Sequence, residues 1–375
     1  MSDEQKSPDQ EPQPSAPEAH AGEAAGPGGL ATAPRASRPD DLLPPVEPPS
    51  AGFIVKLFLV PALIVSLVVF VVFAFNWLVH LGSNPQGYLD DMERGAANAW
   101  QRAHDFASEM RGNPQLRKDS KVADRVVNLL ESHLRQPLGD GNGKDTAEAV
   151  QYRYFLCMAL GQFEVPSGLP VLMQVAAVPA TNDNELRVRL AAIESLALLI
   201  DNIRQNDPNF VDGQLLKLLL DLSSPQDEPE PMVRTRAAFA LGVYGGEEAK
   251  KRLEEMTDAF REPAPEARFN AATGLARMGD AACVPVLIEM LDPEVQLGAD
   301  SSEVGPTERL ALQQRIQANG LKATEMLLKA NPEMDATELR EAVQRLHDTP
   351  NLLAPLKLRT QEVLNLLDQR KSPQQ

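Results

Sequence analysis

The chain has 375 residues, a formal net charge of −17 at pH 7, 5% aromatic residues and two cysteines. Nucleic-acid affinity depends largely on Lys and Arg, so a chain this acidic argues against a nucleic-acid-binding protein. Two cysteines do not indicate a disulfide framework; Cys157 and Cys283 fall at predicted inward positions, where we expect small buried hydrophobic side chains. Few aromatic residues and abundant Ala and Leu favour packed helices over a β-sandwich.

Residues 1–50 are rich in Pro, Glu, Ala and Gly and show no apolar periodicity. Such a segment has too little hydrophobic surface to offset the entropy lost on ordering. We therefore expect a disordered, Pro-rich acidic tail that acts as a flexible spacer. A Pro-rich docking tail is the alternative.

Residues 53–81 predict one transmembrane helix. The run 57–79 carries no charge, and its length matches a hydrocarbon core of about 30 Å. Lys56 is placed to reach one interface, and Trp77 and His80 lie where an interfacial belt is expected at the other. The run is too long, and starts too far into the chain, for a cleaved signal peptide. It is also too long for a buried core helix.

Basic residues near the apolar run predict its orientation. Arg35, Arg38 and Lys56 precede the run, whereas Arg94 and Arg102 follow it. The positive-inside rule counts these bases and slightly favours a cytoplasmic N-terminus. Residues 83–375 are then expected outside the cytoplasm.

Residues 83–135 predict an irregular helical cap, with a break near Gly95 and a further helix over 120–135. The loop 139–146 that follows matches neither a phosphate-binding P-loop nor a calcium-binding loop. A P-loop needs Ser or Thr directly after Lys144, and a calcium loop counted from Asp140 needs Gly at its sixth position. Asp145 occupies both places, so we expect a solvated turn.

Residues 145–292 contain a fourfold repeat. Residues 233–242 read VRTRAAFALG, and residues 267–276 read ARFNAATGLA, about 34 residues later. Weaker copies start at 152 and 188. The inward positions of each copy trace one face of a helix, and the small residues among them allow neighbouring helices to approach closely; these are Ala237, Ala240 and Ala271.

A second helix is predicted after each copy. In the third unit its inward positions are Ala249, Leu253, Met256 and Phe260. The loops between units contain prolines, which end helices. An isolated helix pair cannot bury both of its apolar faces. Stacked pairs bury them against one another and are therefore expected to share one core. Residues 305–369 predict longer helices that close the array as a C-terminal cap.

An aliphatic–Arg pair before Ala-Ala-x-Ala-Leu-Gly, a Gly-Asp turn and a second helix containing Pro-x-Leu resemble the HEAT repeat family. The resemblance is strongest to the short bacterial HEAT-like form also seen in phycobilisome lyases. Residues 232–291 follow the pattern well, 150–177 moderately, and 186–222 only in the first helix. The resemblance implies an all-α fold, an α-solenoid of stacked helix pairs, and is specific for fold rather than function.

One arginine recurs at the same position of each copy: Arg153, Arg189, Arg234 and Arg268. We interpret them as a ladder in which each guanidinium reaches an acid or a helix-end carbonyl of the adjacent unit. A basic strip for an anionic ligand is the alternative, and the negative charge of the chain weakens it.

No catalytic, cofactor-binding or metal site is predicted, because the five histidines are scattered and no HExxH, CxxC or GxSxG pattern occurs. We expect a non-enzymatic, membrane-anchored scaffold that contacts the bilayer through residues 53–81 and binds a protein partner, not nucleic acid, on the solenoid surface. The alternative is a HEAT-like lyase-type enzyme acting on a bound chromophore or other small ligand, or more remotely a HEAT-fold DNA glycosylase. Self-association of the array is a third hypothesis.

Overall fold

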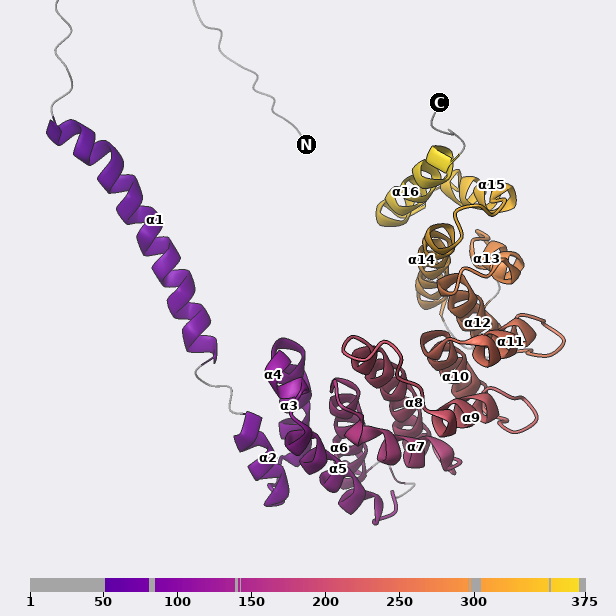
Figure 1. The fold of residues 1–375 in the computed structure, drawn as a ribbon, viewed down its shortest axis with the longest axis horizontal. Helices are drawn as coiled ribbons and strands as arrows, with labels where there is room; N and C mark the ends of the chain where they lie inside the picture. The colour runs from indigo at the N-terminus through magenta and orange to yellow at the C-terminus, as the bar shows by residue number, and fades with distance from the viewer. Residues whose placement is uncertain are drawn as a thin grey trace, which may run out of the picture. The chain divides into compact units, whose positions relative to one another are not determined.

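The computed structural model describes residues 51–80, 85–138, 141, 143–295, 297, 305–350 and 352–370. Helices dominate these residues, which contain no strand (Figure 1). The all-α prediction is therefore confirmed. The predicted disordered tail, 1–50, lies outside the described residues, as does much of the loop 139–146. The chain divides into two units, which we describe separately, at Phe75.

Helix α1 (Ala51–His80) contains the apolar run. Its segment Val55–Phe75 has 21 residues, none of it buried, and is the one helix of the described residues long and apolar enough to cross a membrane. At 1.5 Å per residue it covers about 32 Å. Pro61 lies within the helix without ending it. The side chains of Trp77 and His80, predicted at an interface, lie outside the described part of the chain.

The second unit starts with four helices: α2 (Pro85–Glu93), α3 (Ala99–Gly112), α4 (Pro114–Arg117) and α5 (Ser120–Leu134). The predicted break occurs at Gly95, whose φ of +70° is a conformation that favours glycine. Arg125 joins α5 to α2, because it donates to both carboxylate oxygens of Glu93, at 2.7 and 2.8 Å, and to Asp90 at 2.6 Å.

Four helix pairs follow: α6 (Lys144–Gly161) with α7 (Leu169–Ala177), α8 (Asp183–Arg204) with α9 (Gly213–Leu222), α10 (Pro231–Tyr244) with α11 (Glu247–Met256), and α12 (Pro265–Arg277) with α13 (Val284–Met290). The C-terminal helices are α14 (Pro306–Ala330), α15 (Thr337–His347) and α16 (Ala354–Arg370). Pro231 and Pro265 occupy the first position of α10 and α12, where the missing N–H costs no helical hydrogen bond.

The helices form two layers. The first helices pack side by side in the order α3, α6, α8, α10, α12, α14. Each second helix packs on the first helix of the following pair, α7 on α8, α9 on α10, α11 on α12 and α13 on α14, and α11 and α13 also pack on the first helix of their own pair. Figure 1 shows α8, α10, α12 and α14 on the inner side of the curved array, with α9, α11 and α13 on its outer side. One continuous core runs between the layers. The predicted solenoid of stacked helix pairs is confirmed.

Two glycines lie where the first helices α10 and α12 approach each other closely. A Cβ added to Gly242 of α10 would lie 2.6 Å from the Cα of Gly274 of α12, and a Cβ on Gly274 would lie 2.8 Å from the Cα of Gly242. The predicted small residues are fully buried as well: Ala237, Ala240 and Ala271. Backbones therefore nearly touch where these two helices cross.

The prediction for Phe260 was wrong. Helix α11 ends at Met256, and Phe260 lies in the following loop with its side chain fully exposed. The carboxylate of Asp258 accepts a hydrogen bond from the Phe260 N–H at 2.9 Å, which stabilises a turn. The chain thus leaves the helix one turn before the apolar spacing predicts.

Candidate interaction surface

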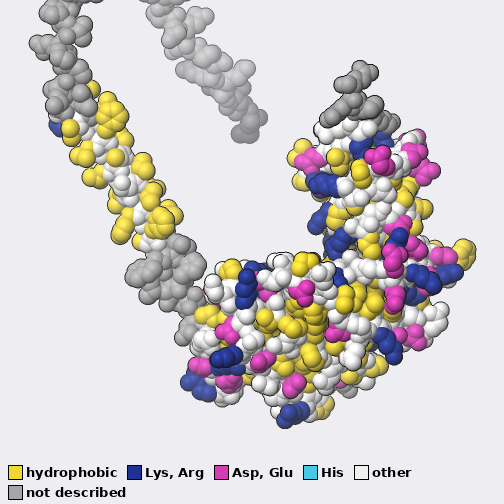
Figure 2. Space-filling view, in the orientation of Figure 1, with side chains coloured by type: hydrophobic (Ala, Val, Ile, Leu, Met, Phe, Trp, Pro, Cys, Tyr) yellow, Lys and Arg dark blue, Asp and Glu magenta, His cyan; other side chains and the backbone are white. Residues whose placement is uncertain are grey.

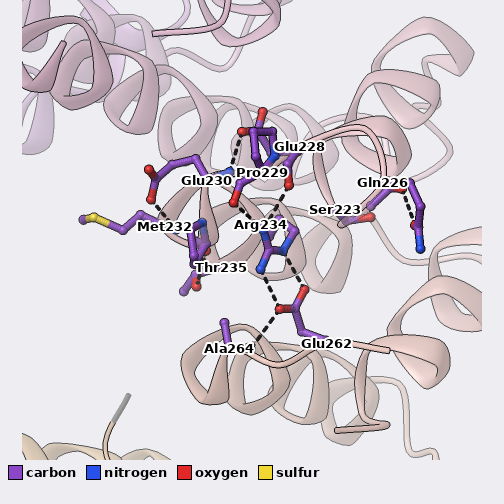
Figure 3. A network of polar contacts seen from close by, with 12 residues as sticks. Ser223, Gln226, Glu228, Pro229, Glu230, Met232, Arg234, Thr235, Glu262 and Ala264 are labelled. Carbon is purple, nitrogen blue, oxygen red and sulfur yellow. Dashed lines mark hydrogen bonds and ion pairs between the residues drawn. The ribbon is translucent and has the colours of Figure 1, made fainter. Parts of the chain in front are cut away.

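The repeat arginines are buried, and Arg234 has the fullest set of partners (Figure 3). Its Nε and Nη2 donate to the two carboxylate oxygens of Glu262 at 2.8 and 2.9 Å. Its Nη1 donates to the carbonyl oxygens of Glu228 and Pro229, both at 2.9 Å. Arg234 and Glu262 come from neighbouring repeats, so this bidentate pair joins them.

Arg189 repeats the arrangement one pair earlier. Its Nη2 donates to Oε2 of Glu228 at 2.6 Å, and its Nε donates to the carbonyl oxygen of Ala176 at 2.8 Å. The ladder interpretation is therefore confirmed for Arg189 and Arg234. Buried charges paired in this way are not available to an anionic ligand.

Sequence reasoning missed the glutamates of this ladder. Glu228 and Glu262 each begin a Glu-Pro-x-Pro segment, six residues before a repeat arginine. The two prolines keep the loop backbone extended, and the carboxylate also accepts from the N–H two residues on, at 3.0 Å in both loops. The recurrence of Glu-Pro-x-Pro at the repeat spacing was the signal that could have identified them.

The two outer arginines depart from this arrangement. Arg268 donates to Glu289 at 2.6 Å, but Glu289 lies in the second helix of the same pair, so the predicted contact with an adjacent unit is wrong here. Arg153 donates from Nη2 to the carbonyl oxygens of His133 (2.6 Å) and Gln136. Arg153 thus uses helix-end carbonyls of the preceding helix, as the ladder predicts.

His133 lies beside Arg153 at the end of α5. Its Nδ1 is buried without a hydrogen-bond partner, and its ring meets Tyr152 edge-on, with 4.5 Å between ring centroids. Burial, with a smaller contribution from the charge of Arg153, lowers the pKa of His133 below 6.5.

We expect stability to fall as the pH drops below about 6.5, because the unfolded chain then binds a proton at His133 that the folded chain resists. His133→Asn is expected to flatten this dependence. Carboxylates with lowered pKa lose their contribution only at lower pH; these are Glu93, Asp280 and Glu325. Thermal unfolding followed by circular dichroism between about pH 7.5 and pH 5 tests this. An unchanged slope in the variant would contradict it.

The inner side of the array carries a stripe of partly exposed residues. On α10 the only residues after Pro231 that are not buried are Met232, Arg236, Phe239 and Val243, which lie on one face of the helix. The other first helices show the same spacing, and we name the set the inner stripe: Gln151, Tyr154, Phe155 and Met158 of α6, with Gln162 directly after it; Arg187, Leu190, Glu194 and Leu198 of α8; the four residues of α10; and Glu266, Asn270, Thr273 and Arg277 of α12.

The composition of the inner stripe changes along the array. From α6 to α10 it is mainly aromatic and aliphatic, whereas on α12 it is polar. Asn270 and Thr273 are already engaged, since they donate to the carbonyl oxygens of Thr235 and Phe269, both at 2.8 Å. On the face shown in Figure 2, hydrophobic side chains likewise gather over the middle of the array, and charged ones are dense around α11.

Arginines border the apolar part of the inner stripe. The guanidinium of Arg187 lies 5.4 Å from the ring centroid of Tyr154, and Arg236 forms an ion pair with Glu194 at 3.7 Å. Both side chains of the Arg236–Glu194 pair are partly exposed, at 39% and 44%, so the pair contributes little to stability. These arginines are therefore free to exchange partners when another surface covers the stripe.

Among the described residues, neither the two cysteines nor a metal-binding cluster forms a reactive centre. Cys157 and Cys283 are free and fully buried, as predicted, and burial raises the pKa of both thiols to about 12. Neutral thiols of this kind are poor nucleophiles. In the part of the chain that the structure describes, no cluster of His, Cys, Asp or Glu is arranged to hold a metal ion.

Residues 267–293, which cover most of α12 and all of α13, match the family model of the PBS lyase HEAT-like repeat. The resemblance predicted from the sequence is confirmed by this match. No match was found among curated proteins. The array thus contains a HEAT-like repeat at α12 and α13, and the arginine ladder joins neighbouring helix pairs of the array.

Proposed function

We propose that this protein is a membrane-anchored, non-enzymatic HEAT-repeat scaffold that binds a protein partner through the inner stripe. The observation that supports this most is that Tyr154, Phe155 and Met158 of α6 and Phe239 of α10 stay partly exposed on the inner side of the array. Aromatic residues, Met and Arg are the types enriched at the centres of protein interfaces, and a polar rim surrounds such centres. The polar stripe of α12 fits the role of a rim.

The charges support a protein rather than a nucleic acid as the partner. The chain carries 53 acidic and 36 basic residues, and the repeat arginines are buried in the ladder. Nucleic-acid binding needs exposed bases that neutralise phosphates. An apolar stripe interrupted by a few charges suits a protein surface instead.

Phe239→Asp is expected to reduce capture of the partner from solubilised membranes about tenfold or more, since buried aromatic anchors dominate interface energies. The full-length protein in detergent serves as bait, and recovery is quantified against the wild type. Arg187→Glu, at an exposed position of the inner stripe, should weaken capture without affecting the fold.

Phe260→Asp is the matched control, because this phenylalanine is fully exposed but lies in the α11–α12 loop, outside the inner stripe. Its capture should equal that of the wild type. Loss of capture with Phe260→Asp but not with Phe239→Asp would place the binding surface elsewhere. Circular dichroism confirms that each variant is folded.

The anchor in this proposal is α1, whose segment Val55–Phe75 has the length and composition of a membrane span. The basic residues before it favour a cytoplasmic N-terminus, so the array is proposed to lie outside the cytoplasm. A reporter enzyme that is active only outside the cytoplasm, fused to the C-terminus, is expected to be active. Activity of a cytoplasm-only reporter at the same position would reverse the orientation.

A lyase-type enzyme is the second candidate, because the family model that matches 267–293 is named for lyases of phycobilisomes. It predicts transfer of a bilin chromophore to an acceptor protein by the purified full-length chain. Clear turnover in that assay would replace the scaffold proposal. Base excision and self-association are tested on the same sample, by a glycosylase assay and by light scattering.

A further inference from the structure

A pocket of about 310 Å³ lies beside Arg153, away from the inner stripe. Leu134 at the end of α5 and residues 136–138 form one wall, and the α7–α8 loop forms the other. Most of its lining is apolar, including Leu138, Val175 and Val178, while the polar groups include Arg153 and Glu185. Val178 is 60% exposed, so the pocket opens to solvent at that residue.

Arg153 is the one repeat arginine that forms no ion pair with the described residues. It is 6% exposed, its Nε is buried without a hydrogen-bond partner, and only its Nη2 donates, to two carbonyl oxygens. Burial lowers the pKa of Arg153 because the guanidinium loses water, an effect that Glu185 partly opposes. The Glu185 carboxylate itself accepts from the N–H and Oγ1 of Thr181, both at 2.8 Å.

One repeat later the chain itself supplies a carboxylate to the equivalent pocket. It is lined by Arg189 and by the α9–α10 loop, which includes Glu228 and Pro229. There, the Glu228 carboxylate reaches Arg189 at 2.6 Å. Glu262 does the same for Arg234 at 2.8 Å. In both cases the residue after the glutamate is proline.

The first pocket lacks this glutamate because α8 starts early. Helices α10 and α12 begin three residues before their repeat arginine, after Glu-Pro-x, whereas α8 begins at Asp183, six residues before Arg189. Asp183 occupies the sequence position of Glu228, but it lies in the first turn of α8 and is exposed. The longer helix therefore removes the loop carboxylate that Arg153 would otherwise receive.

We propose that the Arg153 pocket binds an extended Glu-Pro-x-Pro segment of a partner protein, in the way that the chain's own Glu-Pro-x-Pro loops bind Arg189 and Arg234. The glutamate accepts hydrogen bonds from Arg153, and the prolines contact the apolar walls near Val178. Proline fixes an extended backbone in advance, which lowers the entropy lost on binding. The site is independent of the inner stripe.

The N-terminal tail contains the same pattern at Glu11-Pro12-Gln13-Pro14. If α1 spans the membrane as proposed above, this segment and the array lie on opposite sides. A partner segment is therefore the occupant to which we commit, and occupation by the tail is a separate outcome of the experiment.

The test is fluorescence anisotropy with a labelled peptide of the sequence of residues 226–232, QDEPEPM, and the full-length protein in detergent. Saturable binding is expected. Replacing the glutamate before the first proline by glutamine should weaken binding about tenfold or more, as for loss of a charge-assisted hydrogen bond. Because this change is made in the peptide, it cannot disturb the fold of the protein.

Two variants of the protein complete the test. Val178→Asp places a charge of the same sign as the peptide's glutamate at the mouth of the pocket and should weaken binding severalfold. Val211→Asp, at another exposed valine in the α8–α9 loop, should leave binding unchanged. Phe239→Asp should also leave peptide binding unchanged, which separates this proposal from the proposed function. Equal binding of the glutamine peptide, or no binding by the wild type, would overturn the proposal. Peptide binding by the Glu11→Gln variant but not by the wild type would identify the tail as the occupant of the pocket, and would also overturn the proposal.

Discussion

Glu262→Ala is expected to lower the free energy of unfolding by about 3–5 kcal/mol, the usual cost of leaving one member of a buried ion pair uncompensated. Glu262 and Arg234 are 1% and 4% exposed, so water replaces the lost carboxylate poorly. Arg234 would keep only its two carbonyl partners. Urea unfolding of the full-length protein in detergent, followed by circular dichroism, measures the change.

Glu148→Ala is the control, because Glu148 forms a surface ion pair with Lys144 at 3.7 Å within α6. Exposed pairs contribute little, so a change within about 0.5 kcal/mol is expected. If Glu262→Ala is as stable as this control, the ladder does not hold the repeats together.

Replacing both members of the pair separates a missing partner from lost packing. Arg234→Met combined with Glu262→Leu is expected to restore most of the stability lost in Glu262→Ala, because apolar groups of similar volume often substitute for a buried ion pair. A double variant no more stable than the single one would show that the carbonyl contacts of Arg234 carry most of the energy.

Gly242→Ala is expected to destabilise the array by roughly 1–3 kcal/mol, the range for overpacking a well-packed core. The new methyl group would meet backbone atoms of Gly274 at 2.6 Å, and backbone cannot rotate away as a side chain can. Alanine favours helix by about 1 kcal/mol over glycine, so any measured loss understates the clash. The same unfolding assay applies, and Gly274→Ala should behave alike.

Gly112→Ala provides the matched control, since Gly112 is a helical glycine of α3 with open space around the added methyl group. It should be neutral or slightly stabilising. Equal stability of Gly242→Ala and Gly112→Ala would mean that the α10–α12 crossing yields without cost.

The periodicity of the sequence was sufficient for the helix pairs, because apolar positions such as Ala249, Leu253 and Met256 lie within one helix and reflect one buried face. It was insufficient at Phe260, where a local turn overrode the spacing. The sequence predicted that the repeat arginines form a ladder, but it did not identify the acids that they contact. Glu228 and Glu262 lie in loops, which show no helical periodicity.

By itself, the sequence determined the all-α class, the repeat and the apolar helix α1, since each of these depends on contacts within about 40 residues and repeats its signal along the chain. The tertiary structure decided which groups meet across repeats, such as Arg189 with Glu228, 39 positions apart. It also decided which residues stay exposed on the inner side and that Arg153 forms no ion pair with the described residues. Stacking selects these contacts, because the same helix can present an arginine to a carboxylate or to an open pocket depending on where its neighbour begins.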